Sequence, residues 1–250
     1  MSKPMKAIVL AAGKGTRLRT EGVDLPKVLR QAAGKPLLGY VLEALSFLPA
    51  QDIVLVVGYE GEKVCAAFPG YPRVFQSPQL GTGHAVQCAE GELKGFEGEI
   101  LIAAGDMPLL PRRAYESLVA QHRAEGNVCT ILAAVAEKPM PLGRIVRNAR
   151  GGFARIVEDQ DCTAEEKLIR EINTSIYIFD AKSLWRSLTT LRPSNAQGEY
   201  YLTDAPGWLV EQGEKVGVCA GCTAEEMLGV NTVEQLQQVE EIIKKRRNEA

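Results

Sequence analysis

A glycine-rich loop near the N-terminus combines backbone freedom with positive charge. Gly13 and Gly15 lack a Cβ, so the chain can turn tightly here and bring its amide groups close to a ligand. Lys14 and Arg17 add two cations, and Thr16 adds a hydroxyl. Amides and cations in this arrangement suit a polyphosphate. Taken alone, the loop is also compatible with an ordinary turn between a strand and a helix.

The loop matches neither of the two common glycine-rich phosphate motifs. In a Walker A loop, lysine is followed by serine or threonine, but Gly15 follows Lys14 here, and no glycine lies five residues before Gly13. A dinucleotide-binding fingerprint would have its third glycine where Leu18 stands. The identity of the phosphate ligand therefore depends on the other motifs.

A second motif follows ten residues later, where Pro26 precedes Lys27. Proline fixes its own φ angle and restricts the preceding residue, Leu25, to an extended conformation. We therefore expect Lys27 to project from a stiff stretch of backbone beside the glycine-rich loop.

A third glycine-containing turn, residues 79–85, precedes a predicted helix. The Gln79 amide can both donate and accept a hydrogen bond, which suits the Watson–Crick edge of a pyrimidine, and Gly81 allows a flat base to approach closely. A glycine-rich start of a helix is the alternative interpretation. His84 is expected to be a helix-start or packing residue.

Two side-chain oxygens are candidates for a metal site. Asp106 follows a buried strand, and Asn231 comes just before the last predicted helix. Either residue alone could serve a turn or a helix cap. Mg²⁺ typically takes one or two protein oxygens together with phosphate oxygens, so a triphosphate ligand would make this pair a magnesium site.

Hydrophobic runs alternate with helical periodicity through the first half of the chain. This alternation predicts right-handed βαβ units and a mostly parallel sheet, so the fold class is α/β and Rossmann-like, with helices flanking the sheet. Ligands bind beyond the carboxyl ends of such strands, which places the loops at Gly13, Gln79 and Asp106 on one rim. The expected strands are 7–10, 53–57, 73–76, 99–104 and 128–135, and the expected helices are 36–48, 60–68, 84–93 and 111–125.

The second half has a different rhythm. Strand-like segments could lengthen the sheet or form a small antiparallel cap, and two helices follow. The last helix is expected to begin at Thr232, where Gln235 completes a capping box. The expected strands are 144–147, 153–158 and 172–179, and the expected helices are 182–191, 200–212 and 232 onward.

Composition narrows the class of protein. The 250 residues are 46% hydrophobic and 24% charged, with 29 Lys and Arg against 31 Asp and Glu. Because positive and negative charges nearly balance, the net charge does not indicate binding to nucleic acid or to an anionic membrane. No segment approaches the ~20 apolar residues that a membrane span needs. Six scattered cysteines, including the pair Cys219 and Cys222, indicate small packed side chains in a reducing cytoplasm rather than a metal or redox site.

Together these motifs resemble the sugar-nucleotidyltransferase (nucleoside-diphosphosugar pyrophosphorylase) family. Within it, the chain is similar to the uridyltransferase half of the bifunctional enzymes that make UDP-N-acetylglucosamine, a cell-wall precursor. The resemblance runs from about residue 6 to the last helix and implies the nucleotide-diphospho-sugar transferase fold with a small β-rich sugar-binding cap. It rests on Leu-Ala-Ala-Gly-x-Gly-Thr-Arg at 10–17, Pro-Lys at 26–27, and the segments 143–146, 171–174 and 229–231, with the run Asn-Ala-Gln-Gly-Glu-Tyr-Tyr-Leu-Thr-Asp at 195–204 as its most specific part.

The resemblance implies a nucleotidyltransferase domain over residues 1–231, with a nucleotide-binding part to about 110 and a sugar-binding part over about 111–231, then a helix over 232–250. It also implies residue roles. The nucleotide would contact Leu10, Ala11, Gly13, Gly15, Thr16 and Thr82, with Gln79 and Gly81 reading uracil. The phosphates would be held by the catalytic cations Arg17 and Lys27, and Mg²⁺ by Asp106 and Asn231. The sugar phosphate would contact Gly143, Glu158, Asn173, Tyr201 and Thr203.

In the implied reaction, the phosphate of N-acetylglucosamine 1-phosphate attacks the α-phosphorus of UTP in line and expels pyrophosphate. Two small-molecule substrates are therefore the expected partners. A uridylyl- or thymidylyltransferase for another hexose 1-phosphate is an alternative, as is a catalytically silent domain that binds nucleotide sugars. The presence of Lys27, Asp106 and Asn231 together favours an enzyme.

The sequence departs from the resembling enzymes in two respects. Their carboxyl half is a left-handed β-helix acetyltransferase with hexapeptide repeats, and no such repeat occurs here, so we expect no acetyltransferase activity and a monomer or weak dimer. At the sugar site, Ala104 and Leu142 stand where the family usually has aromatic residues, and Ser175 where it usually has glycine. Unless neighbours refill the lost volume, these changes predict weaker discrimination against glucose 1-phosphate. The first loop is also longer, through residues 20–24.

Overall fold

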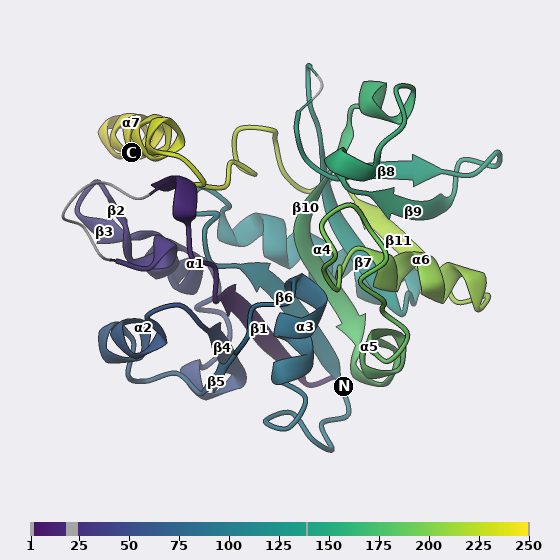
Figure 1. Ribbon diagram of the computed structural model, residues 1–250, viewed down its shortest axis with the longest axis horizontal. Helices are drawn as coiled ribbons and strands as arrows, with labels where there is room; N and C mark the ends of the chain where they lie inside the picture. The colour runs from purple at the N-terminus through teal and green to yellow at the C-terminus, as the bar shows by residue number, and fades with distance from the viewer. Residues whose placement is uncertain (1–2, 19–24, 139, 250) are drawn as a thin grey trace.

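The computed structural model describes residues 3–18, 25–138 and 140–249, with the Thr16 side chain left outside that description. The longer first loop at 20–24 also lies outside the described residues. A mixed sheet runs through the middle of the molecule (Figure 1) in the order β11-β7-β10-β6-β1-β4-β5, with β8 and β9 attached at β10. Its strands are β1 (Met5–Ala11), β4 (Ile53–Val57), β5 (Arg73–Phe75), β6 (Glu99–Ala104), β7 (Cys129–Val135), β8 (Arg144–Arg147), β9 (Phe153–Val157), β10 (Glu171–Asp180) and β11 (Val216–Cys219).

The sheet is mostly parallel, as expected. β1 pairs in parallel with β4 and β6, and β4 with β5, whereas β10 runs antiparallel between β6 and β7. All five residues of β4 are buried, which explains its uninterrupted apolar sequence, because both faces of this strand are covered by helices. β8 and β9 form an antiparallel hairpin, so the second half both extends the sheet and adds a small β-rich cap.

Two apolar cores cover the two faces of the sheet. Alternate residues of β1 divide between them, with Val9 in one core and Ile8 in the other. One face is covered by α1 (Leu37–Ala44), α2 (Gly61–Ala67) and α4 (Arg112–Glu125), and the other by α3 (Thr82–Cys88), α5 (Ala181–Leu188) and α6 (Asp204–Glu211). The arrangement is therefore a three-layer α/β/α sandwich. None of the helices in the described part of the chain is long and apolar enough to span a bilayer.

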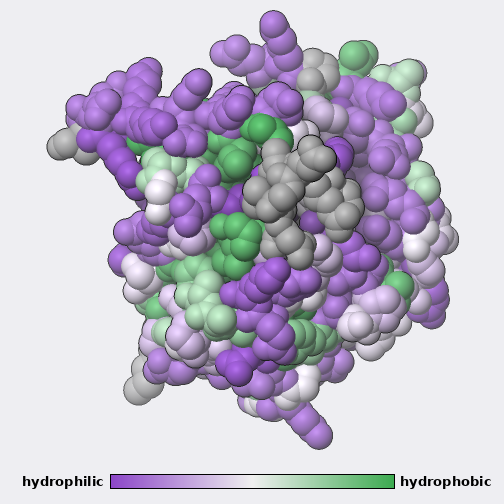
Figure 2. Space-filling view, turned by 60° about the vertical axis from the view of Figure 1, so that its left-hand side comes forward, coloured by the Kyte–Doolittle hydropathy of each residue, from purple (hydrophilic) through white to green (hydrophobic). Residues whose placement is uncertain are grey.

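The last helix, α7 (Val233–Glu249), packs over a third, smaller apolar cluster that includes Leu18, Leu37 and Val239. In Figure 2 its outer surface is mostly hydrophilic, with hydrophobic residues gathered beneath it. The expected capping box is confirmed: the Gln235 backbone amide donates to Thr232 Oγ1 (3.3 Å), and Gln235 Oε1 accepts from the Thr232 amide (3.1 Å).

Three local differences from the sequence-based expectations have clear physical causes. The helix expected from Tyr200 begins only at Asp204, because the Tyr200 amide donates to the Leu80 carbonyl and its carbonyl accepts from the Gly83 amide. β11 was not expected; it pairs with β7 and has only four residues, Val-Gly-Val-Cys, which are too few to show a clear alternation. The short hairpin of β2 (Gln31–Ala32) and β3 (Lys35–Pro36) was also missed, since two-residue strands carry no periodicity.

Candidate active site

A cavity of about 420 Å³ opens at the carboxyl ends of the parallel strands. The loops that follow β1 and β6 and the turn before α3 all contribute to it, so the predicted rim is confirmed as a geometric arrangement. Of the residues predicted to contact nucleotide, phosphate or metal, the cavity is lined by Leu10, Gly13, Lys27, Gln79, Gly81, Thr82 and Asp106.

Lys27 lies between the two predicted metal ligands. Its Nζ is 2.5 Å from Asp106 Oδ2 and 2.9 Å from Asn231 Oδ1. A backbone bond from the Val230 amide to the Asp106 carbonyl (3.0 Å) ties the segment before α7 to the loop after β6. Gln235 Oε1 also accepts from the Asn231 amide (2.7 Å), so the cap of α7 fixes the backbone that carries this ligand.

Gly15 makes room for the lysine, whereas Gly13 is not needed for that purpose. Gly15 has φ +58°, and a Cβ there would lie 2.8 Å from Lys27 Cβ, whereas a Cβ on Gly13 would lie 4.0 Å from Lys27 Cε. The sequence predicts that these glycines let the chain turn tightly and bring amide groups close to a ligand. The structure shows that Gly15 also allows the Lys27 stem to pass against the backbone.

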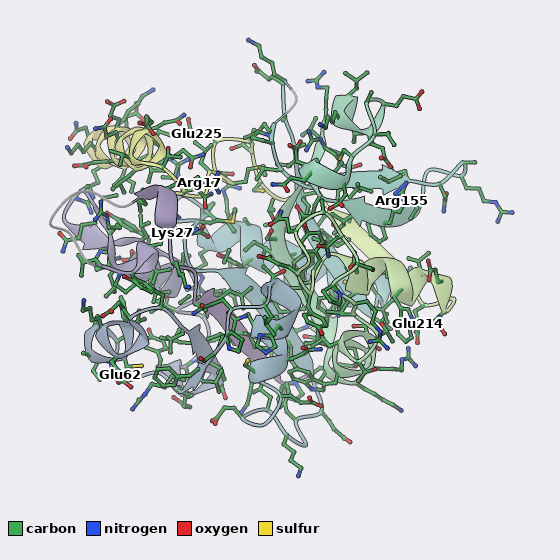
Figure 3. All side chains as sticks on the ribbon, in the orientation of Figure 1. Arg17, Lys27, Glu62, Arg155, Glu214 and Glu225 are labelled. Atoms are coloured by element: carbon green, nitrogen blue, oxygen red, sulfur yellow. The ribbon has the colours of Figure 1, made fainter. Side chains whose placement is uncertain are left out.

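Two other cations of the loop point to solvent. Lys14 and Arg17 are both exposed, and within the described residues neither has an ion-pair partner. Lys14 lines the cavity but Arg17 does not. Figure 3 shows Arg17 and Lys27 on the same side of the molecule, below α7. The structure therefore brings Lys27 into the site and leaves Arg17 at its edge.

The turn at Gln79 is held by contacts that sequence reasoning missed. Buried Gln76 donates from Nε2 to the Gly81 carbonyl (2.9 Å). A Cβ on Gly58, directly after β4, would lie 2.7 Å from Gln79 Nε2. Gly81 has φ +112°, and a Cβ there would lie 2.6 Å from the Tyr200 carbonyl oxygen, so backbone of the 195–204 run fills the space on that side. A glycine directly after a buried strand was the available signal for Gly58.

A second group of predicted residues gathers beside the β8–β9 hairpin. The Asn173 amide donates to the Gly143 carbonyl (2.9 Å), and a Cβ on Gly143 would lie 3.4 Å from Glu158 Oε2. Thr203 donates a side-chain hydrogen bond to Glu158, and buried Tyr201 lies near the same carboxyl. Thus all five predicted sugar-site residues are brought together.

The Asn173 side chain makes its hydrogen bonds within the protein. Its Nδ2 donates to Tyr177 Oη (2.8 Å), and its Oδ1 accepts from the Ser175 amide (3.1 Å). These bonds stabilise an irregularity in β10 between Asn173 and Tyr177, where Ser175 has φ +61°. Ser175 lines the cavity, and the left-handed backbone explains why glycine would suit this position.

Glu158 is a carboxyl of this region whose pKa is raised. Burial raises the pKa of the Glu158 carboxyl, and Asp204, Asp161 and Asp159 raise it further, whereas the Thr203 hydrogen bond acts in the opposite direction. A raised pKa in the folded state means that the fold binds this proton more tightly than the unfolded chain does. Stability from this group is therefore present at low pH and is lost as pH rises through the raised pKa.

We expect Glu158→Gln to remove this loss of stability at higher pH. The variant should be more stable than the natural chain at pH 7, and the difference should shrink as pH falls toward 4, where both forms are neutral. Urea titrations of the two proteins at several pH values measure it. A difference in unfolding free energy that stays constant with pH would show that ionisation of Glu158 is not its cause.

The residues around Lys27 fit a divalent cation. A carboxylate oxygen and an amide oxygen already contact one positively charged group at hydrogen-bond distance, and hard cations prefer oxygen ligands of this kind. Among the described residues no cluster of three or more His, Cys, Asp or Glu side chains has metal-binding geometry. With these two oxygens as ligands, a divalent cation would keep coordination positions for phosphate oxygens and water.

Comparison with known families decides what kind of domain holds this site. The model of the MobA-like NTP transferase domain matches residues 7–175, which include the glycine-rich loop, Lys27 and Asp106. The chain belongs to this family. It is accordingly a nucleotidyltransferase-type domain, and the match confirms the family resemblance read from the sequence.

Individual relatives give the same result. The chain is 44% identical over 245 residues to the bifunctional protein GlmU of Streptococcus thermophilus, and 43% identical over 245 residues to that of Clostridium acetobutylicum. These alignments cover 97–98% of this chain but only 53% of each relative, so the chain spans about half the length of the curated relatives that it matches. A Bacillus anthracis protein assigned as a glucose-1-phosphate thymidylyltransferase, solved in complex with a sucrose, has a TM-score of 0.71. At 21% identity, and with 96% of this chain and 95% of that one covered, this likeness confirms the fold.

Proposed function

We propose that this NTP transferase domain makes UDP-N-acetylglucosamine and pyrophosphate from UTP and N-acetylglucosamine 1-phosphate. The observation that carries the proposal is the contact of Lys27 with both Asp106 and Asn231 at the cavity. A silent nucleotide-sugar-binding domain would have no need to hold these three groups together. The identity of 43–44% to bifunctional GlmU proteins over nearly the whole chain supports the assignment.

The chain's own residues would act by binding and charge neutralisation. The triphosphate is proposed to lie against the loop amides at Gly13 and Gly15, with Lys27, Lys14 and Arg17 supplying positive charge. Gln79 would read the uracil edge. Since the attacking phosphate is already an anion, no general base and no covalent intermediate are needed, and catalysis consists of positioning two anions against their mutual repulsion.

A divalent cation fits the Asp106 and Asn231 oxygens and, when bound, would neutralise charge on the triphosphate. We propose Mg²⁺ for this role. The sugar phosphate is proposed to enter beside Gly143 and Glu158, with Tyr201 and Thr203 near the same carboxyl.

A pyrophosphate-release assay across nucleoside triphosphates and sugar 1-phosphates tests the proposal. We expect turnover with UTP and N-acetylglucosamine 1-phosphate, dependence on added Mg²⁺, and a clear preference for UTP over ATP, because the Gln79 turn suits the smaller ring. Equal use of ATP would contradict the assigned base pocket. Turnover with no pair would favour the silent binding domain.

A uridylyl- or thymidylyltransferase for another hexose 1-phosphate is the second candidate, favoured by the small side chain of Ala104 at the cavity. The preference for N-acetylglucosamine 1-phosphate over glucose 1-phosphate is expected to be modest. A lost hydrogen bond or packing contact costs about 1–3 kcal/mol, or roughly ten- to hundredfold in discrimination. Leu142, which packs at the edge of one apolar core, marks the second position where an aromatic hydroxyl is missing.

The ratio of kcat/KM for the two sugar phosphates measures this effect. It should rise in the double variant Ala104→Tyr, Leu142→Tyr, whereas the kcat/KM ratio of UTP to ATP should not change. A ratio that is already high in the natural chain and unmoved in the double variant would mean that neighbouring groups refill the pocket.

A further inference from the structure

The Lys27 ammonium occupies the centre of the proposed cation site. Its Nζ contacts one oxygen of Asp106 and one of Asn231, at 2.5 and 2.9 Å, and these are the two oxygens assigned to the metal. The Lys27 and Asp106 side chains are only 15% and 18% exposed, so water screens their attraction weakly. The negative charge that would attract a divalent cation is therefore already neutralised by a group of the chain itself.

The fold holds the lysine in this place. Its stem passes directly over Gly15, where any Cβ would collide with Lys27 Cβ at 2.8 Å. The short 3-10 turn Lys27–Leu29 begins after Pro26, whose φ of −53° fixes the backbone from which the side chain projects. The backbone at Gly15 and the backbone after Pro26 therefore both allow the Lys27 contact.

Binding of a free divalent cation at this site is opposed by several free-energy costs. It would have to shed part of its hydration shell, break the Lys27–Asp106 ion pair and leave a displaced ammonium beside a second positive charge. A triphosphate reverses the balance, because its oxygens supply further metal ligands and also give the ammonium anionic partners on the cavity side, where Gly13 and Lys14 lie.

We propose that Lys27 is an internal stand-in cation that closes the Asp106–Asn231 pair to a free divalent cation, so that metal enters only together with a triphosphate. This inference rests on the proposed function, since it takes that pair as the metal site. It gives Lys27 two places to bind: the ligand pair in the free protein and the triphosphate in the complex. It also implies that metal and nucleotide bind as one unit.

Measuring Mn²⁺ binding tests the proposal. The full chain is titrated without nucleotide, and electron paramagnetic resonance quantifies the free ion. Lys27→Met should bind Mn²⁺ at least ~10-fold more tightly than the natural chain, because one unit charge in contact with the ligands is removed. Lys14→Met is the matched control: it removes the same charge from the same cavity, but Lys14 is exposed and does not contact Asp106. Its affinity should stay within about threefold of the natural chain, since exposed charges are screened.

The double variant Lys27→Met, Asp106→Ala should lose the gained affinity, which would assign the bound Mn²⁺ to this pair. Lys27→Gln serves as the second variant if the methionine variant does not fold. Equal Mn²⁺ affinity in the natural chain and in both Lys27 variants would overturn the proposal, as would an equal gain in Lys14→Met. The pyrophosphate-release assay on the natural chain is independent of these results, so failure here and failure of the proposed function can be told apart.

Discussion

Replacing Asp106 by alanine is expected to lower kcat/KM for pyrophosphate release at least ~100-fold, the scale of removing one preorganised electrostatic contact. The change removes the acidic member of the proposed metal pair and leaves the Lys27 ammonium, which is 15% exposed, without its ion-pair partner. Lys27→Ala should cause a loss of similar size. Neither side chain belongs to the three apolar clusters, so both variants should remain folded.

Asp52→Ala provides a matched control. Asp52 pairs with Lys6 at 3.8 Å, about a third of each side chain is exposed, and it comes just before β4, at the opposite end of that strand from the cavity. Exposed ion pairs contribute little, so kcat/KM should change by less than about twofold. Steady-state kinetics with circular dichroism of all the variants gives the comparison. Near-normal turnover by Asp106→Ala or Lys27→Ala would remove the site assignment.

Gly15→Ala is expected to have the second largest effect. The new Cβ would lie 2.8 Å from Lys27 Cβ and would also force alanine into a backbone conformation with φ +58°. The left-handed conformation alone costs about 1 kcal/mol. The collision displaces Lys27 from its ligand pair, and a misplacement of about 1 Å in a catalytic group can cost ~100-fold in rate, so we expect kcat/KM to fall at least ~10-fold.

Gly34→Ala separates the two contributions. Gly34 has φ +81° in the turn between β2 and β3, but a Cβ there would meet nothing within 4 Å. Both variants should lose unfolding free energy because of the left-handed backbone, and Gly15→Ala should lose more because of the collision; urea titration measures both losses. Only Gly15→Ala should lose activity. Equal activity in the two variants would show that room for the Lys27 stem is not the reason for glycine at position 15.

The fold was largely predictable because the strands at its centre contain apolar runs, uninterrupted in β4, and its helices have amphipathic spacing. The rim could also be predicted, since parallel strands bring their carboxyl ends to one edge, and the loops at Gly13, Gln79 and Asp106 do line one cavity. Segments that depend on distant contacts were harder. β11 was missed because its partly exposed residues form a strand only through pairing with β7.

The candidate site was also only partly predictable from the sequence. The family resemblance assigned Lys27, Asp106 and Asn231 to the site, but the sequence did not show that one ammonium contacts both oxygens, because these residues are far apart in the chain. The Tyr200 backbone against Gly81 was equally invisible, since a glycine near a helix start has several possible causes. Local sequence can indicate a reactive side chain, whereas the residue that it contacts depends on the tertiary fold.

The fate of the UTP α-phosphorus tests the proposed uridylyl transfer most directly. The purified chain would be incubated with Mg²⁺, N-acetylglucosamine 1-phosphate and UTP labelled at the α-phosphorus, and the products separated. We expect the label in UDP-N-acetylglucosamine, one unlabelled pyrophosphate released for each UDP-sugar formed, and neither product with Asp106→Ala. Label recovered only in UTP or UMP, or a UDP-sugar formed equally well by Asp106→Ala, would contradict the proposed function of this site.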